Sequence, residues 1–339
     1  MTGLIFILLL VLFLPFSVKL VERNLEIFLF IMGISAAWVS GILDASLLTK
    51  ALIDPIKITI AVLIAGLLFK WLKVPLEKSV RRISETIPYP LFFALVVIIL
   101  GLLSSIITAI IASLVLVIIV SVIRLERSSE VRLVIIACFS IGLGAALTPI
   151  GEPLSTIIVS KLNEDVFFLS KLIGREVVLG IIMMGIVAAL FIPPRFKKTR
   201  ITADNDTETY QEIVFRTGKI YLFVMGLTLL GAGFEPFINT YILGLHENVL
   251  YWINMISAVL DNATLAAAEI SPSMTHQTIK AILLGLIISG GMLIPGNIPN
   301  IISSGKLRIT SSEWAKFGVP FGFITMLIYF LVILGDKHF

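Results

Sequence analysis

Two acidic residues stand inside long apolar stretches of this sequence. Asp261 follows the apolar residues Val259 and Leu260, and Glu152 lies in the segment Thr148–Pro153, which interrupts another apolar run. A charge buried in a membrane costs several kcal/mol and usually has a function. Burial favours the neutral acid, whereas a bound cation favours the carboxylate. A site built from these two acids is therefore able to exchange a small cation for a proton.

Neutral oxygen donors stand near both acids in the sequence. Hydroxyls, amides and unpaired backbone carbonyls are ligands that suit hard cations. We expect Asp261 and Glu152 to hold a transported Na⁺, with eight supporting ligands: Ser105, Thr108, Thr148, Ser155, Asn262, Thr264, Asn297 and Asn300. The alternative for any one Ser or Thr is a hydrogen bond to its own helix. The N-termini of short helices at the same place are equally suited to an anion.

Each acid also has a purely structural interpretation. Asp261 is in a position to cap the short helix that follows it, as acids often do. Glu152 is in a position to pair with a buried lysine such as Lys161 or Lys171. We keep both alternatives beside the cation site.

The composition places the chain in a membrane. Of its 339 residues 58% are hydrophobic and 14% are charged, whereas a soluble domain averages about 25% charged residues. The mean hydropathy is +1.06, and the net charge of +4 is no sign of a nucleic-acid partner. The single cysteine, Cys138, allows no internal disulfide. The sequence has no P-loop motif, no nucleophile–base arrangement and no cluster of its His residues, so we expect neither an enzyme nor a resident cofactor.

Six apolar segments have the length of a simple membrane-spanning helix, which needs roughly 20 residues. They are Gly3–Leu20, Leu25–Leu43, Pro55–Leu72, Lys171–Ile192, Lys219–Gly233 and Trp314–Gly335. The run Pro90–Leu125 is too long for one crossing, and Pro and Gly interrupt two other long runs at Thr148–Pro153 and Ile294–Pro299. Broken backbone at membrane depth survives only inside protein or beside a wet cavity. We therefore expect both breaks to face the interior.

The distribution of Lys and Arg indicates how these segments cross the membrane. Most of the 26 basic residues fall on the inner side if Pro90–Leu125 and Val249–Ile270 are each a re-entrant helical hairpin. We then expect eight crossing helices and two hairpins of opposite orientation. The alternative for the first hairpin is one long tilted helix, or two full helices with a buried turn. The same arrangement places Glu269 at the membrane interface and Asp44 and Asp54 in a solvated outer loop.

The second half of the chain repeats the first. A shift of 145 residues superimposes the two breaks: Gly151 on Gly296, Glu152 on Asn297 and Ser155 on Asn300. A shift of 154 residues places Ala109 of the first hairpin on Ala263 of the second. Inverted repeats with broken helices at the midplane are typical of transporters. We divide the chain into N-terminal scaffold helices (1–54), a first inverted repeat (55–193), a cytoplasmic linker (194–217) and a second inverted repeat (218–339).

Three motifs resemble the ion transporter superfamily, nearest its sodium/proton antiporter and arsenite permease branches. Thr148–Pro153 is similar to the T-P-I-G-x-P motif of the first broken helix there, and Ser311–Pro320 to the start of the last helix of each repeat. Ser257–Asn262 resembles the hairpin motif. The resemblance covers roughly Pro55–Gly335. It implies a homodimer in which a scaffold supports a mobile transport domain that moves as an elevator.

These observations predict an all-α, multi-pass secondary active transporter of the plasma membrane. The symporter branch of the superfamily has Ser-Asn-Thr at its hairpin tips, whereas the tips here are Ser105–Thr108 and Asp261–Thr264. The difference favours cation/proton antiport, Na⁺ or Li⁺ for H⁺, with Asp261 as the shared carrier and Glu152 as a second acid. The alternative is an ion-coupled anion carrier for arsenite or a di- or tricarboxylate. The expected partners are the bilayer, a second copy of the chain and the small ion, with no nucleic acid.

Overall fold

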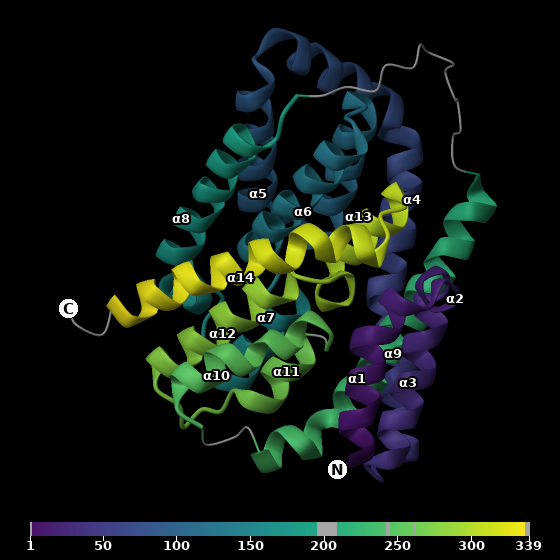
Figure 1. Cartoon of the computed structure of the whole chain (residues 1–339), viewed down its shortest axis with the longest axis vertical. Coiled ribbons are helices and arrows are strands. Elements are labelled where there is room, and N and C mark those ends of the chain that lie inside the picture. The colour runs from purple at the N-terminus through teal and green to yellow at the C-terminus, as the bar shows by residue number, and fades with distance from the viewer. Residues whose placement is uncertain (1, 195–208, 242–244, 261, 336–339) are drawn as a thin grey trace.

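The computed structural model describes residues 2–194, 209–241, 245–260 and 262–335 (Figure 1). All regular elements in these residues are helical. The first half holds α1 (Thr2–Ser17), α2 (Lys19–Arg23), α3 (Leu25–Val39), α4 (Ala45–Thr86), α5 (Tyr89–Ile123), α6 (Arg127–Ala145), α7 (Pro153–Leu162) and α8 (Phe168–Phe191). The second half holds α9 (Tyr210–Tyr241), α10 (Glu247–Ile253), the 3₁₀ helix η1 (Asn254–Ala258), α11 (Asn262–Glu269), α12 (His276–Gly290), the 3₁₀ helix η2 (Ile294–Gly296), α13 (Ile298–Leu307) and α14 (Ser311–Gly335).

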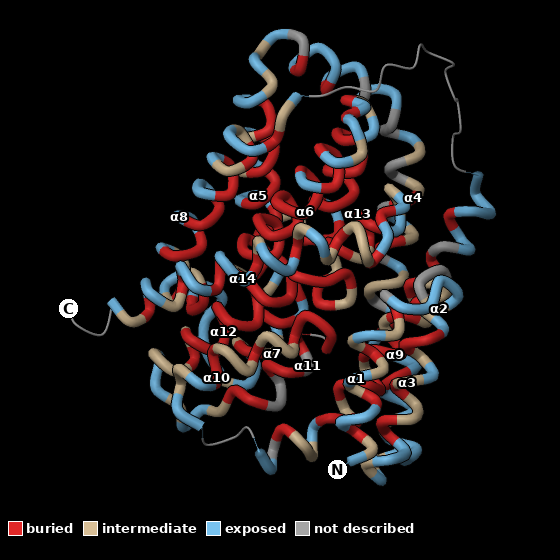
Figure 2. The backbone as a smooth tube through the Cα atoms, viewed as in Figure 1, coloured by how far each residue is buried: buried red, intermediate tan, exposed pale blue. Residues whose placement is uncertain are grey.

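Five of the described helices are long and apolar enough to cross a membrane: α5, α6, α8, α9 and α14. Their outer faces expose large apolar side chains, and on α8 Met183 and Leu190 are 56% and 73% exposed. Water would penalise such a surface by about 25 cal/mol per Å², whereas lipid does not. Buried residues fill the centre of the molecule (Figure 2). The chain is therefore an all-α membrane protein, which confirms that part of the prediction.

Two groups of helices can be followed in Figure 1. In the scaffold group, α1 packs on α3, and α3 and α4 both pack on α9. Gly33 and Gly226 lie where α3 and α9 cross, and a Cβ on either would meet the backbone of the other helix. Small residues at such crossings let membrane helices approach closely. The other helices, α5–α8 and α10–α14, form a larger core group.

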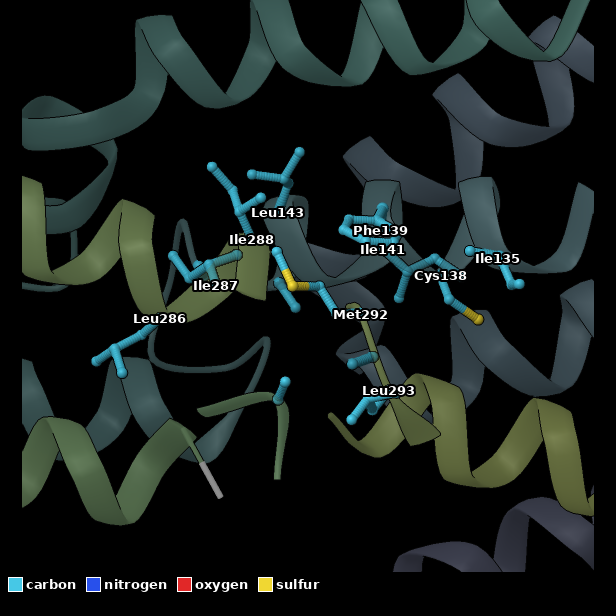
Figure 3. Packing of buried hydrophobic residues seen from close by; sticks show 14 of the residues in the cluster. Ile135, Cys138, Phe139, Ile141, Leu143, Leu286, Ile287, Ile288, Met292 and Leu293 are labelled. Atoms are coloured by element: carbon cyan, nitrogen blue, oxygen red, sulfur yellow. The ribbon is translucent and has the colours of Figure 1, made fainter. Parts of the chain in front are cut away.

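The helices α6 and α12 occupy the centre of the core group. Almost every residue of both helices is buried, on all sides, as expected of a helix enclosed by other helices. Phe139 and Leu143 of α6 belong to one apolar cluster with Ile288 of α12 and Met292 (Figure 3). Because this cluster joins the two halves of the chain, it fixes the two broken segments relative to each other.

The helix α5 is divided into two arms at Thr108, whose φ of 74° and ψ of 151° are not helical. The first arm packs on α6: Ser140 Oγ donates to Val97 O at 2.9 Å, and Gly101 lies against Gly144. Positive φ at a residue other than Gly is costly and is kept only where the surroundings enforce it. The long apolar run predicted to be divided is therefore divided, at one of the predicted site residues.

The two predicted helix breaks have the same local structure. Glu152 precedes α7 with φ −155° and ψ 161°, and Asn297 precedes α13 with φ −154° and ψ 147°. Both helices have ten residues, start with proline in their first turn and end at a left-handed residue, Asn163 or Arg308. The equivalence expected from the shift of 145 residues therefore holds for the backbone of both breaks.

The helix boundaries differ from the predictions at two places. The helix α4 extends from Ala45 to Thr86, so Asp54 lies inside a helix and not in an outer loop; Asp44 caps that helix by accepting from Leu47 N at 2.7 Å. Pro55 sits within α4 without ending it. The helix α9 begins at Tyr210, inside the segment predicted as a linker. Charged residues stand in the added turns, Lys50 and Asp54 in α4 and Glu212 in α9 among them, so hydropathy alone does not assign these turns to a membrane helix.

Candidate functional site

A cavity of about 660 Å³ lies where the two breaks meet the scaffold group. Its wall includes Thr108 from the division of α5, Glu152 from the first break, Asn262 from the start of α11 and Asn297 from the second break. These four predicted residues come from both halves of the chain. The cavity therefore brings together the places where the helical hydrogen-bond ladder is interrupted.

Glu152 is held in this wall by the turn that precedes it. Gly151 comes so close to the backbone of Ala145 that a Cβ there would collide with the Ala145 carbonyl. The Gly151 carbonyl in turn accepts from Ala109 N at 3.0 Å, which ties the first break to the second arm of α5. The Glu152 side chain is 94% buried, with 6% exposed. The acid is thus enclosed by protein at the wall of the cavity.

Asn297 and Asn262 supply amide groups to the same wall, and both are buried, with 5% and 4% of their surface exposed. Gly142 of α6 has no side chain facing Asn297, and a Cβ there would meet the Asn297 amide nitrogen. The Asn262 amide nitrogen has no hydrogen-bond partner among the described residues. A buried donor of this kind costs free energy unless something polar occupies the cavity.

Four predicted ligands lie behind the cavity wall and bind backbone carbonyls. Thr148 donates to Ser105 O, Ser155 to Ala146 O and Ser105 to Leu102 O. Asn300 donates to both Gly290 O and Leu293 O at 2.9 Å. These side chains satisfy carbonyls that the breaks leave unpaired, so they position the turns. The alternative considered for Ser and Thr, a bond to the residue's own helix, describes Ser105, whereas Thr148 and Ser155 bond to carbonyls of other segments.

Asp261 lies outside the described residues, as does the Thr264 side chain. Of their described neighbours, Leu260 is buried with 1% exposed and Asn262 lines the cavity. Lys171, one of two partners considered for Glu152, is exposed and forms an ion pair of 2.9 Å with Asp165. That ion pair removes Lys171 as the partner of Glu152.

Scaffold residues complete the cavity with groups that the sequence did not single out. Asp54 and Lys50 of α4 and Glu235 and Thr228 of α9 all line it. Carboxylates, hydroxyls and amides together form a donor set that suits a small hard cation. Among the described residues, no three His, Cys, Asp or Glu side chains converge as a permanent metal site would require.

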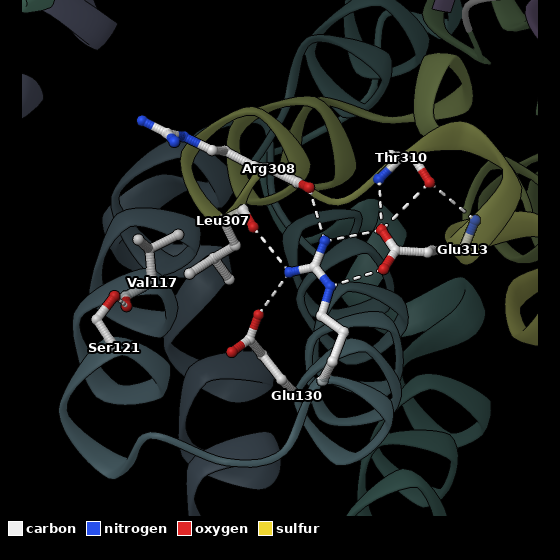
Figure 4. Close-up of polar contacts among 8 residues, drawn as sticks. Val117, Ser121, Glu130, Leu307, Arg308, Thr310 and Glu313 are labelled. Atoms are coloured by element: carbon white, nitrogen blue, oxygen red, sulfur yellow. Dashed lines mark hydrogen bonds and ion pairs between the residues drawn. The ribbon is translucent and has the colours of Figure 1, made fainter. Parts of the chain in front are cut away.

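An arginine on α6 joins the ends of three helices. Arg127 donates to both Glu313 oxygens at 2.7 Å, to Glu130 at 2.7 Å, and to the carbonyls of Leu307 and Arg308 (Figure 4). These five bonds use all five guanidinium N–H groups. Because Leu307 and Arg308 end α13, the arginine fixes the second broken helix to α6 and α14.

A second ion pair, more deeply buried, joins the two halves elsewhere. Lys280 of α12 contacts Glu176 of α8 at 2.8 Å, and their side chains are 11% and 5% exposed. The Glu176 carbonyl also accepts from the Tyr329 hydroxyl of α14 at 2.9 Å. Sequence reasoning missed both ion pairs, although isolated charges in apolar helices were the available signal.

The fold and the cavity define a class: an all-α membrane protein with a cavity, lined by polar and apolar residues, at two helix breaks. Within that class, residues 1–335 match the family model described as Protein of unknown function (DUF1646), so the chain belongs to this family. No curated protein matches the chain.

Proposed function

We propose that this protein is a cation/proton antiporter that exchanges Na⁺ or Li⁺ for H⁺ across the plasma membrane. The observation that carries the proposal is the cavity of about 660 Å³ where Glu152 meets Asn297 and Asn262. An acid and two amides, buried at membrane depth, form a site that binds a small cation in one protonation state and releases it in the other. Asp261, next to Asn262 in the chain, is the proposed shared carrier.

Contact directions support a hairpin in the first half. The first arm of α5 is parallel to α6, because Val97 contacts Ser140 and, one turn later in both helices, Gly101 contacts Gly144. The helix α13 is antiparallel to α6, because the later α6 residue Cys138 contacts the start of α13 at Pro299, whereas the earlier residue Arg127 contacts its end at Leu307. The second arm of α5 runs with α13, since Ile110 packs on Ile302 and Val117 lies near Leu307 (Figure 4). The two arms therefore run in opposite directions.

The second half supports the same arrangement. Ser104 of the first arm donates to Ile141 O, and Ser257, one residue before the position aligned with Ser104, donates to Leu286 O, which stands 145 residues after Ile141. Matching polar contacts of this kind favour two repeats, each with a re-entrant hairpin and a broken helix. Repeats of this kind bind their substrate where the broken helices meet.

The division into two groups of helices supports elevator-type access. The cavity lies between the scaffold helices α4 and α9 and the core-group breaks. Beside it, the seam between the groups is apolar: Val62 and Ile220 of the scaffold group belong to one cluster with Leu114 and Ile302 of the core group. An apolar seam has few directional bonds to break, so it lets one group slide past the other. We further propose that the protein works as a homodimer joined through its scaffold groups.

One observation favours a second function, an ion-coupled carrier of arsenite or a di- or tricarboxylate. Lys50 lines the cavity, and the helices α7 and α13 begin at the cavity wall. A lysine and two helix N-termini suit an anion. Uptake of labelled arsenite or labelled dicarboxylate that requires Lys50 would identify this function in place of antiport.

The test uses purified protein in liposomes loaded with a pH-sensitive dye. A pH gradient is imposed, and Na⁺, Li⁺, K⁺ or Ca²⁺ is added in turn. Dequenching by Na⁺ or Li⁺ that is lost in Asp261→Asn and Glu152→Gln supports antiport. Silence with every cation, in protein that is still folded, rejects it. Glu164→Gln, in the exposed turn between α7 and α8, is the matched control and should behave as wild type.

A further inference from the structure

A buried acid outside the cavity has no cationic partner among the described residues. Glu269 ends α11 and is 1% exposed, although the sequence placed it at the membrane interface. Neither of its carboxyl oxygens has a hydrogen-bond partner among the described residues. Its carboxyl lies beside the side chain of Asn254. The interfacial prediction is wrong because the short helix α11 packs inward, on α7, α9 and α12.

Asn254 presents a second unsatisfied acceptor at the same place. It is 0% exposed, its amide nitrogen donates to Ile282 O at 3.5 Å, and its side-chain oxygen has no partner among the described residues. The Asn254 side chain thus offers its N–H to the Glu269 carboxyl, whereas its oxygen has no donor among the described residues. Leaving a buried acceptor unsatisfied costs about 1–3 kcal/mol, and more when it is charged. One proton on the acid supplies the missing donor.

The charges on the neighbouring elements do not supply a substitute. The titratable side chains described on the helices packed against α11 are Lys161 of α7, Tyr210, Glu212, Lys219, Tyr221, Glu235 and Tyr241 of α9, and His276 and Lys280 of α12. Lys280 forms an ion pair of 2.8 Å with Glu176, and Lys219 forms one of 3.6 Å with Glu26. None of these groups donates a hydrogen bond to Glu269.

We propose that Glu269 and Asn254 form a proton-binding site, separate from the cavity, in which the protonated Glu269 donates to the Asn254 side-chain oxygen. The inference rests on the proposed antiport only for its role, as a proton-carrying group besides the cation site. The step is a proton transfer alone: the O–H bond of Glu269 breaks, water takes the proton and a carboxylate remains. Neither residue lines the cavity.

The site exists in one half of the chain only. With the shift of 154 residues that aligns the hairpins, Glu269 falls on Val115 and Asn254 on Leu100. The two residues belong to different arms of the second segment, α11 and η1. The proton therefore ties the arms together, and its loss leaves a buried charge that is relieved only when the arms separate and water enters. The second hairpin becomes the proton-sensitive one.

Infrared difference spectroscopy on the purified full-length protein tests the site without any transport. Raising the pH should remove a carbonyl stretching band of a protonated carboxyl group, and that band should be missing in Glu269→Gln. In Asn254→Leu the band should shift to higher frequency, because its hydrogen bond is lost. Glu164→Gln is the control and should keep the band unchanged. A band that is the same in wild type and Glu269→Gln overturns the proposal.

Two further measurements guard against misreading the variants. Glu269→Gln keeps the size of the side chain and a hydrogen-bond donor, so its midpoint of thermal unfolding at low pH should match that of wild type. If Glu269→Gln does not fold, Asn254→Leu takes its place in the infrared experiment. A carboxyl band that does not shift in Asn254→Leu would also overturn the proposal. In liposomes, Glu269→Gln should still exchange Na⁺ for protons, but the pH dependence of its exchange rate should differ from that of wild type. A Glu269 band in a protein that exchanges no cation rejects the antiport and leaves the proton site standing.

Discussion

Glu152 and Asn297 occupy the same place in two matching turns, one in each half of the chain, with backbone φ angles of −155° and −154°. Each precedes a ten-residue helix, and both line the same cavity. One is an acid and the other an amide, so the pair supplies one negative charge and one neutral ligand. In the proposed antiporter, Glu152 would therefore supply a charge and Asn297 a neutral ligand from matched positions.

Glu152→Gln should weaken cation binding without unfolding the protein. Glutamine keeps the size of the side chain but removes the charge that attracts the cation. We expect the apparent affinity for Na⁺ to fall at least about tenfold, which corresponds to about 1.4 kcal/mol. Na⁺-dependent protection against thermal unfolding measures it. Unchanged protection in Glu152→Gln would place the cation elsewhere.

Asn297→Cys should react with a water-soluble thiol reagent, and Na⁺ should slow the reaction. The protein without the new cysteine should react very little, because Cys138 is the sole native cysteine and is buried, with 1% exposed. Asn300→Cys is the matched control: Asn300 is 0% exposed and stands behind the wall, so it should react far more slowly. Equal labelling at both positions, or labelling that ignores Na⁺, would contradict the assignment of the wall.

Arg127→Lys should destabilise the protein although it keeps the charge. A lysine ammonium has three donors and no planar fork, so it cannot replace the five bonds to Glu313, Glu130 and the end of α13. The Arg127 and Glu313 side chains are 39% and 33% exposed, so solvent screens the loss. We expect the free energy of unfolding to fall by about 1–2 kcal/mol, measured by thermal unfolding in detergent. The exposed Arg132→Lys should shift the midpoint much less.

The sequence predicts the positions of the breaks well. Pro and Gly at Thr148–Pro153 and Ile294–Pro299 mark both turns, and the matched shift between the halves predicts that Glu152 and Asn297 are equivalent. These features are local, because proline and glycine act on the backbone next to them. The membrane class follows from composition alone.

The sequence does not predict which polar side chains face the cavity. Ser155 and Asn300 stand in the breaks as expected, yet both turn toward backbone carbonyls, and their direction depends on the packing of α6 and α12. Glu269 was placed at an interface because a short helix gives no periodicity by which to tell its inner face. Asp54 and Glu235 enter the cavity from α4 and α9, which the sequence does not connect to the breaks.

Either single substitution in the Glu176–Lys280 pair should destabilise the protein more than the double substitution does. Removing one partner leaves a buried charge, so Glu176→Met and Lys280→Met should each cost about 3–5 kcal/mol. The double variant should be closer to wild type than either single variant, because no charge is stranded. A double variant whose loss equals the sum of the two single losses would show that the pair does not interact.

The central claim is that one protein couples the movement of a cation to that of a proton. In the same proteoliposomes, loss of radioactive Na⁺ and gain of protons are recorded together as a Na⁺ gradient is released. We predict proton movement in proportion to Na⁺ movement and in the opposite direction, with both fluxes lost in Asp261→Asn and in Glu152→Gln. Na⁺ efflux without proton movement, or full exchange in Asp261→Asn, would contradict the account.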